Sequence, residues 1–291
     1  MKRLFIAGII MLLVAPLTFI AAEYAIPFII PYELEFNAHI LSIDNIYSAE
    51  KGRFLGAQLS KTQNYAEVIG HKDGIALVHC TFDVQTLSGE KIAHFERLNG
   101  IDPRTGKHVP GYGEQDRDGY MWGPRNLKKG EPFTRWHVNY NAPANLKYVG
   151  TEKIEGLKTY MYEADYNADQ TENLGHLPDV PEKYGINVDV NLKVWVEPVT
   201  GRMIKYEDHS NAYFYDVKTT ARIHEWNRFN NRLTLPSIQK NVADARTEKL
   251  QILLLQWVIP LAIGLGGLVL LILSFRKVSG QKRNRKHNKH R

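Results

Sequence analysis

Few residues in this sequence are of types that do chemistry, and its one cysteine is the first candidate. Cys80 directly follows His79, and a thiol beside an imidazole can act as a nucleophile with its base. Both lie in the stretch IALVHCTFDV (75–84), where apolar residues alternate as they do in a half-buried strand. Neighbouring side chains of a strand point to opposite faces, so this pair is poorly placed to act together. We therefore predict that Cys80 is buried and inert.

Polar side chains elsewhere form only fragments of metal sites. His94 and Glu96 share one face of a predicted strand, but two ligands alone do not hold a metal ion. Asp116, Asp118 and Gly119 resemble the start of a calcium loop, yet the glycine comes two positions too early and no glutamate follows at the required distance. An Asx-type turn explains these three residues better. The sequence also lacks the serine-elbow, phosphate-loop and zinc-helix motifs, so we predict no catalytic residue, no metal site and no cofactor.

An aromatic-rich stretch supplies the candidate binding residues. They are Tyr112, Tyr120, Trp122, Phe133, Trp136 and Tyr140. Aromatic side chains dominate the burial of ordinary cores, and they also line apolar ligand pockets. Core packing is the default interpretation, and a ligand pocket is the functional alternative.

The elements that must position these residues are mostly strands. Alternating apolar residues at 75–84, 133–140 and 186–196 predict half-buried antiparallel strands. In the second of these, the alternation assigns Trp136, Val138 and Tyr140 to the apolar face and Arg135, His137 and Asn139 to the other. The expected fold class is mainly β (α+β), an extracytoplasmic domain of curved antiparallel sheets flanked by two transmembrane helices.

Two turns of similar sequence occur 95 residues apart, IDPRTGKHV (101–109) and VEPVTGRMI (196–204). Each has an acid, Pro, any residue, Thr, Gly and a basic residue, which predicts a hairpin connection because Pro fixes φ and Gly accepts a positive φ. The recurrence indicates either two related sheet units, about 36–145 and 146–235, or two independent uses of a common turn. Between them, the acidic segment 163–184 lacks apolar periodicity, and we expect it to be a surface connector.

Both ends of the chain are apolar enough to cross a membrane. Leu4–Ala22 holds 19 uncharged residues behind Lys2 and Arg3, and no small-x-small cleavage site follows at the usual place. Ile252–Phe275 holds 24 uncharged residues, more than the approximately 20 that a transmembrane helix needs. We predict an uncleaved transmembrane helix at 1–22, a β-rich domain at 23–235, and a juxtamembrane and transmembrane helix at 236–275.

Charge predicts the topology. The segment 276–291 holds eight Lys and Arg residues and no acid, and Lys and Arg beside a membrane helix stay in the cytoplasm. Both termini are therefore expected to be cytoplasmic, with the main domain outside the plasma membrane. Without the ten basic residues of the two ends, 27 Lys and Arg face 31 acids, so the domain itself is acidic. We expect no nucleic-acid partner, and we expect the tail to bind anionic lipid headgroups of the bilayer.

The second apolar segment contains a small-xxx-small pair, Ala262 and Gly266. Such pairs let another helix pack closely. The partner helix is either the first helix of the same chain or that of another copy, which would give a homo-oligomer.

Three stretches resemble a known family. They are NGIDPRTGK (99–107), YVGTEKIEGLKTYMYE (148–163) and VWVEPVTGRM (194–203). They are similar to the DUF3068 family, also called PorA-like, whose members carry an N-terminal helix, a β-rich outer part and a C-terminal helix. The resemblance implies the same architecture here, while two helices alone do not form the closed barrel of a porin. At the level of fold, the hairpins are also similar to those of lipid-carrying periplasmic proteins of the LolA and LppX type.

The expected function is noncatalytic. A large outer domain anchored at both ends, with no catalytic motif, favours a cell-envelope protein that binds or scaffolds a lipid, glycan or protein partner. One alternative is a receptor or sensor subunit that relays through the C-terminal helix to a cytoplasmic partner. Another is an envelope hydrolase that uses scattered carboxylates such as Asp116 and Glu163 as acid and base.

Overall fold

The computed structural model describes residues 2–174 and 183–287. The chain forms two compact units, one of Tyr32–Arg246 and one of Met1–Pro31 with Thr247–Arg291. We call the first the β domain and the second the helical unit.

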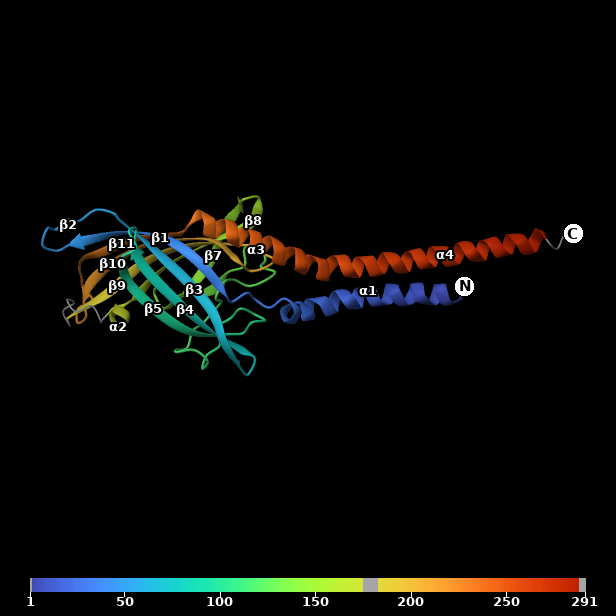
Figure 1. The fold of residues 1–291 in the computed structure, drawn as a ribbon, viewed down its shortest axis with the longest axis horizontal. Coiled ribbons are helices and arrows are strands. Elements are labelled where there is room, and N and C mark those ends of the chain that lie inside the picture. The colour runs from blue at the N-terminus through green and yellow to red at the C-terminus, as the bar shows by residue number, and fades with distance from the viewer. Residues whose placement is uncertain (1, 175–182, 288–291) are drawn as a thin grey trace. The chain divides into compact units, whose positions relative to one another are not determined.

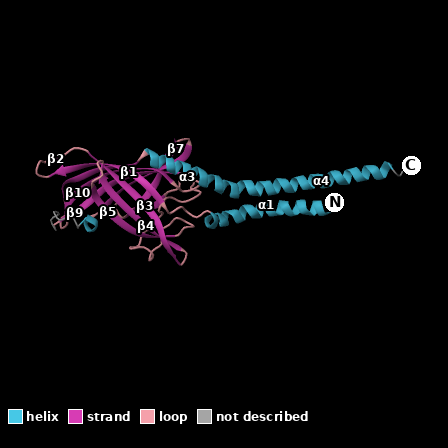
Figure 2. Ribbon diagram, viewed as in Figure 1, coloured by secondary structure: helices cyan, strands magenta, loops and turns pink. Residues whose placement is uncertain are grey.

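The β domain is built on a single antiparallel sheet, coloured magenta in Figure 2. Its strands are β1 (Phe36–Ser48), β2 (Arg53–Phe54), β3 (Gln58–Lys72), β4 (Ile75–Thr86), β5 (Lys91–Ile101), β6 (Phe133–His137), β7 (Ala142–Ile154), β8 (Leu157–Asp169), β9 (Tyr184–Val196), β10 (Met203–Asp216) and β11 (Arg222–Leu233). A short helix, α2 (Thr171–Leu174), follows β8. The mainly β, antiparallel fold class is confirmed.

The order of the strands explains how distant segments meet. Across the sheet it is β5-β4-β3-β1-β11-β10-β9-β8-β7-β6, and β2 pairs with β1 outside this path (Figure 1). The first and last strands of the chain are therefore neighbours, with Ile40 opposite Leu233. This pairing joins all the strands into one continuous sheet, whose edges are β5 and β6. The boundary near residue 145 that was proposed between two units falls inside β7.

The sheet is strongly curved. In a flat sheet, β4 and β10 would lie about 19 Å apart, because four strand spacings of about 4.8 Å separate them. In the structure, Phe82 of β4 and Tyr206 of β10 line the same small cavity. The inner, concave face of the sheet therefore wraps around this cavity.

The core of the β domain fills the concave face. The alternating residues Val188, Val190, Leu192 and Val194 of β9 are nearly fully buried in the larger of two main clusters, which spans β6 to β11. The smaller main cluster holds the inward residues of β4, such as Val78 and Cys80. Cys80 is buried as predicted, and burial raises the pKa of its thiol to about 12, which keeps it protonated.

The segment 163–184, expected to be a connector, is partly a strand. Strand β8 continues to Asp169 and pairs with β9 from Tyr160 opposite Val196 to Asp169 opposite Asn187. The prediction failed because polar outward residues such as Asp165 and Asn167 hide the alternation with buried Ala164 and Ala168. The rest of the predicted connector up to residue 182 lies partly outside the described residues.

Long helices occupy both ends of the chain. They are α1 (Lys2–Ile29), α3 (Leu235–Leu253), the π-helical turn η1 (Leu254–Val258) and α4 (Ile259–His287). Helix α3 begins in the β domain, where Val242 and Ala245 pack with Ile204 of β10. Both α1 and the stretch Leu235–Arg276 are long and apolar enough to cross a membrane.

The π turn has a local cause in the sequence. Pro260 lacks a backbone N–H, and in a regular α-helix its ring would meet the carbonyl of residue 256. The wider turn ends with the N–H of Ile259 bonded to the carbonyl of Leu254. Such a turn relieves the crowding without ending the helix.

Helices α1 and α4 meet through glycines in the helical unit. A Cβ added to Gly267 would lie 2.9 Å from the carbonyl oxygen of Gly8, so the two backbones are in contact there. The residues proposed from sequence are placed differently: a Cβ added to Gly266 would lie 2.8 Å from Met11 Cε, and Ala262 is exposed. Their role in packing stays a prediction.

Candidate functional site

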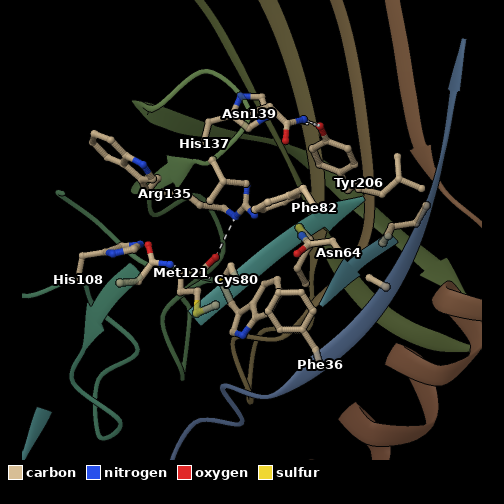
Figure 3. A pocket seen from close by; sticks show the side chains of 18 residues that line it. Phe36, Asn64, Cys80, Phe82, His108, Met121, Arg135, His137, Asn139 and Tyr206 are labelled. Atoms are coloured by element: carbon tan, nitrogen blue, oxygen red, sulfur yellow. Dashed lines mark hydrogen bonds between the residues drawn. The ribbon is translucent and has the colours of Figure 1, made fainter. Parts of the chain in front are cut away.

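The candidate site is a cavity on the concave face of the β domain (Figure 3). Its volume is about 50 Å³, where one water needs roughly 10–15 Å³. It is lined by Phe36, Ala38, Ile40, Asn64, Cys80, Phe82, Asn99, His108, Met121, Trp122, Arg135, Trp136, His137, Val138, Asn139, Met203, Tyr206 and Leu233. The space suits a few waters or the end of a longer molecule.

Strand alternation supplies the apolar part of the lining. Phe36, Ala38 and Ile40 are alternate residues of β1, and Cys80 and Phe82 are alternate residues of β4. Alternate side chains of a strand share a face, so both sets point to the concave side. These residues make one wall of the cavity mostly apolar, and Asn64 of β3 adds one amide between Ala38 and Phe82.

The covering segment between β5 and β6 (residues 102–132) supplies the opposite wall. His108, Met121 and Trp122 come from this segment, which returns to the sheet edge through isolated bridges such as Tyr120 opposite Arg135. Strand β6 is consequently buried on both sides, and Arg135, Trp136 and His137 are each less than a tenth exposed.

Several buried polar atoms of the lining lack partners. Asn64 Oδ1, Asn99 Oδ1, His108 Nε2, Arg135 Nη1 and Trp136 Nε1 make no hydrogen bond with any described residue. A buried polar group without a partner costs roughly 1–3 kcal/mol. Five such atoms around one cavity indicate that something other than the protein chain satisfies them there.

A carboxylate lies next to the cavity in a hydrogen-bonded network. Asp208 is fully buried and accepts hydrogen bonds from Tyr206 at 3.2 Å, from Asn231 at 3.3 Å and from the hydroxyl of Ser210. Burial raises the pKa of Asp208, and these hydrogen bonds oppose the rise. The side chains of this network therefore satisfy one another.

His137 joins the network from β6. Its Nδ1 lies 2.6 Å from the hydroxyl of Tyr166, and its Nε2 lies 3.9 Å from Asp208 Oδ2, which is too far for a hydrogen bond. Burial, with the charge of Arg135, lowers the pKa of His137 well below its ordinary value. The imidazole is thus neutral at physiological pH, and the geometry is that of a structural contact.

Comparison with known proteins identifies the family. A family model described as Porin PorA matches residues 101–276. This chain belongs to the PorA family. The predicted resemblance to PorA-like proteins is confirmed, and the match includes the covering segment, β6 to β11 and most of the second apolar helix.

The other comparisons add little to the PorA assignment. No curated protein matches. One solved structure, of an exported protein with a YmcC-like fold from Bacteroides fragilis, is 10% identical, covers 70% of this chain and 95% of its own, and has a TM-score of 0.30. A likeness at this level carries no argument about function.

The six aromatic residues proposed from sequence divide between cavity and core in this PorA domain. Trp122 and Trp136 line the cavity. Phe133 and Tyr140 belong to the larger core cluster, and Tyr120 packs against it. Tyr112 lies elsewhere, with its hydroxyl donating to Asp73 at 3.3 Å.

The alternation proposed for residues 133–140 was wrong about Arg135 and His137. Both were assigned to the solvent face, and both are buried beside the cavity. Arg135 and His137 alternate with Phe133 of the larger core cluster and lie on its side of β6, while the covering segment packs against Trp136 on the other side. Both sides of the strand are therefore buried, and no local pattern in the strand reveals this. Sequence reasoning also missed His108, although a signal existed: His108 and Met203 occupy the same position after the two similar turns, and both line the cavity.

The polar fragments considered as metal sites form ordinary contacts. Asp116 accepts a hydrogen bond from the N–H of Gly111 at 2.8 Å. The donor lies five residues before Asp116, so this contact differs from the predicted Asx-type turn, in which the donor follows the acid. On the outer face, His94 contacts Asp83 at 2.7 Å through Nδ1 and Glu96 at 3.0 Å through Nε2. These two contacts raise the pKa of His94, and the contact with Glu96 has the larger effect. Within residues 2–174 and 183–287, no group of three or more His, Cys, Asp and Glu side chains is arranged to hold a metal ion.

Proposed function

We propose that this PorA-family chain is a membrane-anchored envelope protein whose β domain binds the end of a lipid-like ligand in the concave cavity. The observation that carries the proposal is the lining itself: apolar side chains from β1 and β4 face buried polar atoms that the chain leaves unsatisfied. Ligand sites combine an apolar lining with a few placed polar groups in this way. Glycan binding is less well supported, because the lining residues of β1 and β4 are apolar and Asn64 of β3 adds a single amide between them.

Membrane anchoring is supported by the two long apolar helices. Lys2 and Arg3 precede the first, and Arg276 follows the second. Under the rule that Lys and Arg stay in the cytoplasm, the proposed topology has two passes, cytoplasmic termini and an extracytoplasmic β domain. The basic tail would then contact anionic headgroups of the inner leaflet.

The family is described as a porin, and the outer face of the sheet indicates whether the β domain itself could be a transmembrane barrel. On β9, Asp189, Asn191 and Lys193 alternate with buried apolar residues and point outward. Lys193 contacts Glu163 at 3.3 Å on this face. A transmembrane barrel has the reverse pattern, with apolar residues outward and polar residues inward. We infer that the β domain sits in water, and that any pore activity would need another part of the chain.

Ligand occupancy can be tested by native mass spectrometry of the full chain in mild detergent, with extraction of copurifying lipids. Ala38→Phe places a ring in the cavity, whereas Asn37→Phe places the same ring on the exposed, opposite face of β1. We expect a bound lipid-like molecule in the wild type and in Asn37→Phe, and at least a fivefold lower occupancy in Ala38→Phe. An empty wild-type protein, or equal occupancy in both variants, would contradict the proposal.

A further inference from the structure

The most unusual group of the cavity is the guanidinium of Arg135. Its side chain is only 6% exposed, and its Nε donates to the backbone carbonyl of Met121 at 3.1 Å (Figure 3). Its Nη1 has no hydrogen-bond partner among the described residues, and no Asp or Glu of the described chain forms an ion pair with it. Burial lowers the pKa of Arg135, but an arginine remains charged in proteins. A buried, unpaired cation is costly unless another group neutralises it.

The surroundings of Arg135 do not supply that negative charge. The groups whose charges act on Arg135 are the phenols of Tyr206 and Tyr166, and burial raises the pKa of both, so both are neutral. The buried carboxylate of Asp208 is hydrogen-bonded within its own network and forms no ion pair with Arg135 in the described chain. Arg117 is a second buried cation nearby, but it is paired with Glu114 at 2.5 Å. Arg135 is therefore a buried cation of the lining that no carboxylate of the described chain balances.

Other unsatisfied polar atoms belong to residues that line the same cavity. Trp136 Nε1 can only donate a hydrogen bond, and it has no acceptor among the described residues. The ring of His108 lies beside that of Trp136, tilted by 59° with centroids 6.4 Å apart, and its Nε2 is also without a partner among the described residues. The cavity lining thus combines a positive charge with an unused donor, which is the chemistry that recognises an anion.

The opposite wall is apolar, with Phe36, Phe82 and Leu233. We propose that Arg135 binds the carboxylate of a fatty-acid-like amphiphile whose first carbons lie against this wall. The inference rests on the proposed function, since it names the ligand class of the same cavity. A carboxylate carries the single negative charge that would balance Arg135, whereas a phosphate monoester carries about −1.5 to −2. Waters would satisfy the donors but would leave the charge of Arg135 unbalanced.

The test compares an acid and an alcohol of the same chain length. Binding of palmitate and of hexadecanol to the full chain in detergent is measured by equilibrium partition of the radiolabelled compounds. For the wild type, we expect palmitate to bind more tightly than hexadecanol. Arg135→Gln should weaken palmitate binding about 10- to 100-fold and leave hexadecanol binding unchanged, because it removes one charge-assisted hydrogen bond. Arg104→Gln, at an exposed arginine, should change neither.

Two further variants and one further probe keep the inference falsifiable. Trp136→Phe keeps the ring and removes the N–H, so it should weaken palmitate binding about 3- to 10-fold even if Arg135→Gln does not fold. Ala38→Phe should lower the binding of both compounds. If palmitate and hexadecanol bind equally and resist both Arg135→Gln and Trp136→Phe, the role of Arg135 is overturned while the cavity remains a lipid site. If hexadecyl phosphate binds more tightly than palmitate, the carboxylate assignment is wrong. If none of the three compounds binds the wild type, the proposed function fails as well.

Discussion

Two turns of this protein have nearly the same sequence and the same internal geometry, but they stand in different surroundings. In both, the glycine has a positive φ, 71° at Gly106 and 74° at Gly201. The N–H of Gly106 bonds to the carbonyl of Asp102 at 2.8 Å, and that of Gly201 bonds to Glu197 at 2.9 Å. The acid-Pro-x-Thr-Gly pattern therefore sets the turn locally, wherever it occurs.

The surroundings of the two turns differ in burial and in the element that each turn leads into. The turn at 197–202 joins β9 to β10, and its acid, Glu197, is fully buried. The turn at 102–107 leads into the covering segment, and its acid, Asp102, is partly exposed. The comparison teaches that local sequence determines the shape of a turn, whereas its contribution to stability depends on the residues that pack against it.

Replacing the glycine of each turn by alanine should give the largest difference in stability between the two turns. A Cβ at Gly201 would overlap the backbone oxygen of Gly123, whereas at Gly106 the nearest atoms, 3.0 Å away, belong to the ring of Tyr32. Both alanines carry the strain of a positive φ, about 1–2 kcal/mol. The ring of Tyr32 needs to shift by only a few tenths of an ångström to accept an alanine at position 106, whereas the backbone around Gly123 must move much further to accept one at position 201. We expect Gly201→Ala to lower the free energy of unfolding by about 3–4 kcal/mol and Gly106→Ala by about 1–2 kcal/mol.

Urea unfolding of the full chain in detergent, followed by tryptophan fluorescence, measures both glycine variants. Gly130→Ala is the matched control, because Gly130 has a φ of 88° with no atom within 4 Å of an added Cβ. It should show the strain alone. Equal losses for Gly201→Ala and Gly130→Ala would show that the packing of Gly123 against the second turn contributes nothing.

Replacing the acid of each turn by its amide should give the next largest difference in stability. Glu197 accepts hydrogen bonds from the N–H groups of Val199 at 2.9 Å and Thr200 at 2.8 Å, out of contact with water. In Glu197→Gln, the amide keeps an acceptor but loses the charge, and a charge-assisted bond is worth about 1.5–3 kcal/mol. We expect a loss of about 2 kcal/mol in the free energy of unfolding. Asp102→Asn, at the partly exposed equivalent, should lose less than about 1 kcal/mol in the same urea assay. A larger loss at Asp102 would reverse the ranking by burial.

These particulars show what the sequence could and could not predict. The turns and the strand that holds Cys80 were predictable because a few neighbouring residues determine each of them. The pairing of β1 with β11 joins residues almost 200 positions apart, as in Ile40 opposite Leu233, and no local pattern encodes it. The curvature that forms the cavity follows from such pairings.

The candidate site was predictable only in part, for a related reason. Trp122 and Trp136 were candidates because aromatic side chains often line apolar ligand pockets. Arg135 was assigned to solvent because a charged residue in an alternating strand normally faces water. Its burial depends on the covering segment, which folds over β6 from a separate stretch of chain. A pattern within one strand carries no information about a second segment that packs against it, so it does not predict a residue that both elements bury.

The smallest expected effect concerns the residue after each turn, His108 in the first and Met203 in the second. Burial, with the charges of Arg117 and Arg135, lowers the pKa of His108 to about 3. In the unfolded chain the pKa of histidine is about 6.5. Below this pH, His108 binds a proton in the unfolded state but not in the folded state. Stability is therefore lost as the pH falls through 6.5, by about 1.4 kcal/mol from His108 at pH 5.5 relative to pH 8.

His108→Met gives the first turn the residue of the second and removes this proton linkage. The difference in unfolding free energy between pH 8 and pH 5.5 should become smaller than that of the wild type by about 1.4 kcal/mol. It should not vanish, because the pKa of the buried His137 is also lowered and adds a loss of the same sign. His71→Gln, at an exposed histidine, should keep the wild-type difference. An unchanged difference in His108→Met would mean that His108 takes up its proton in the folded state, and that an anion or solvent reaches the cavity to stabilise it.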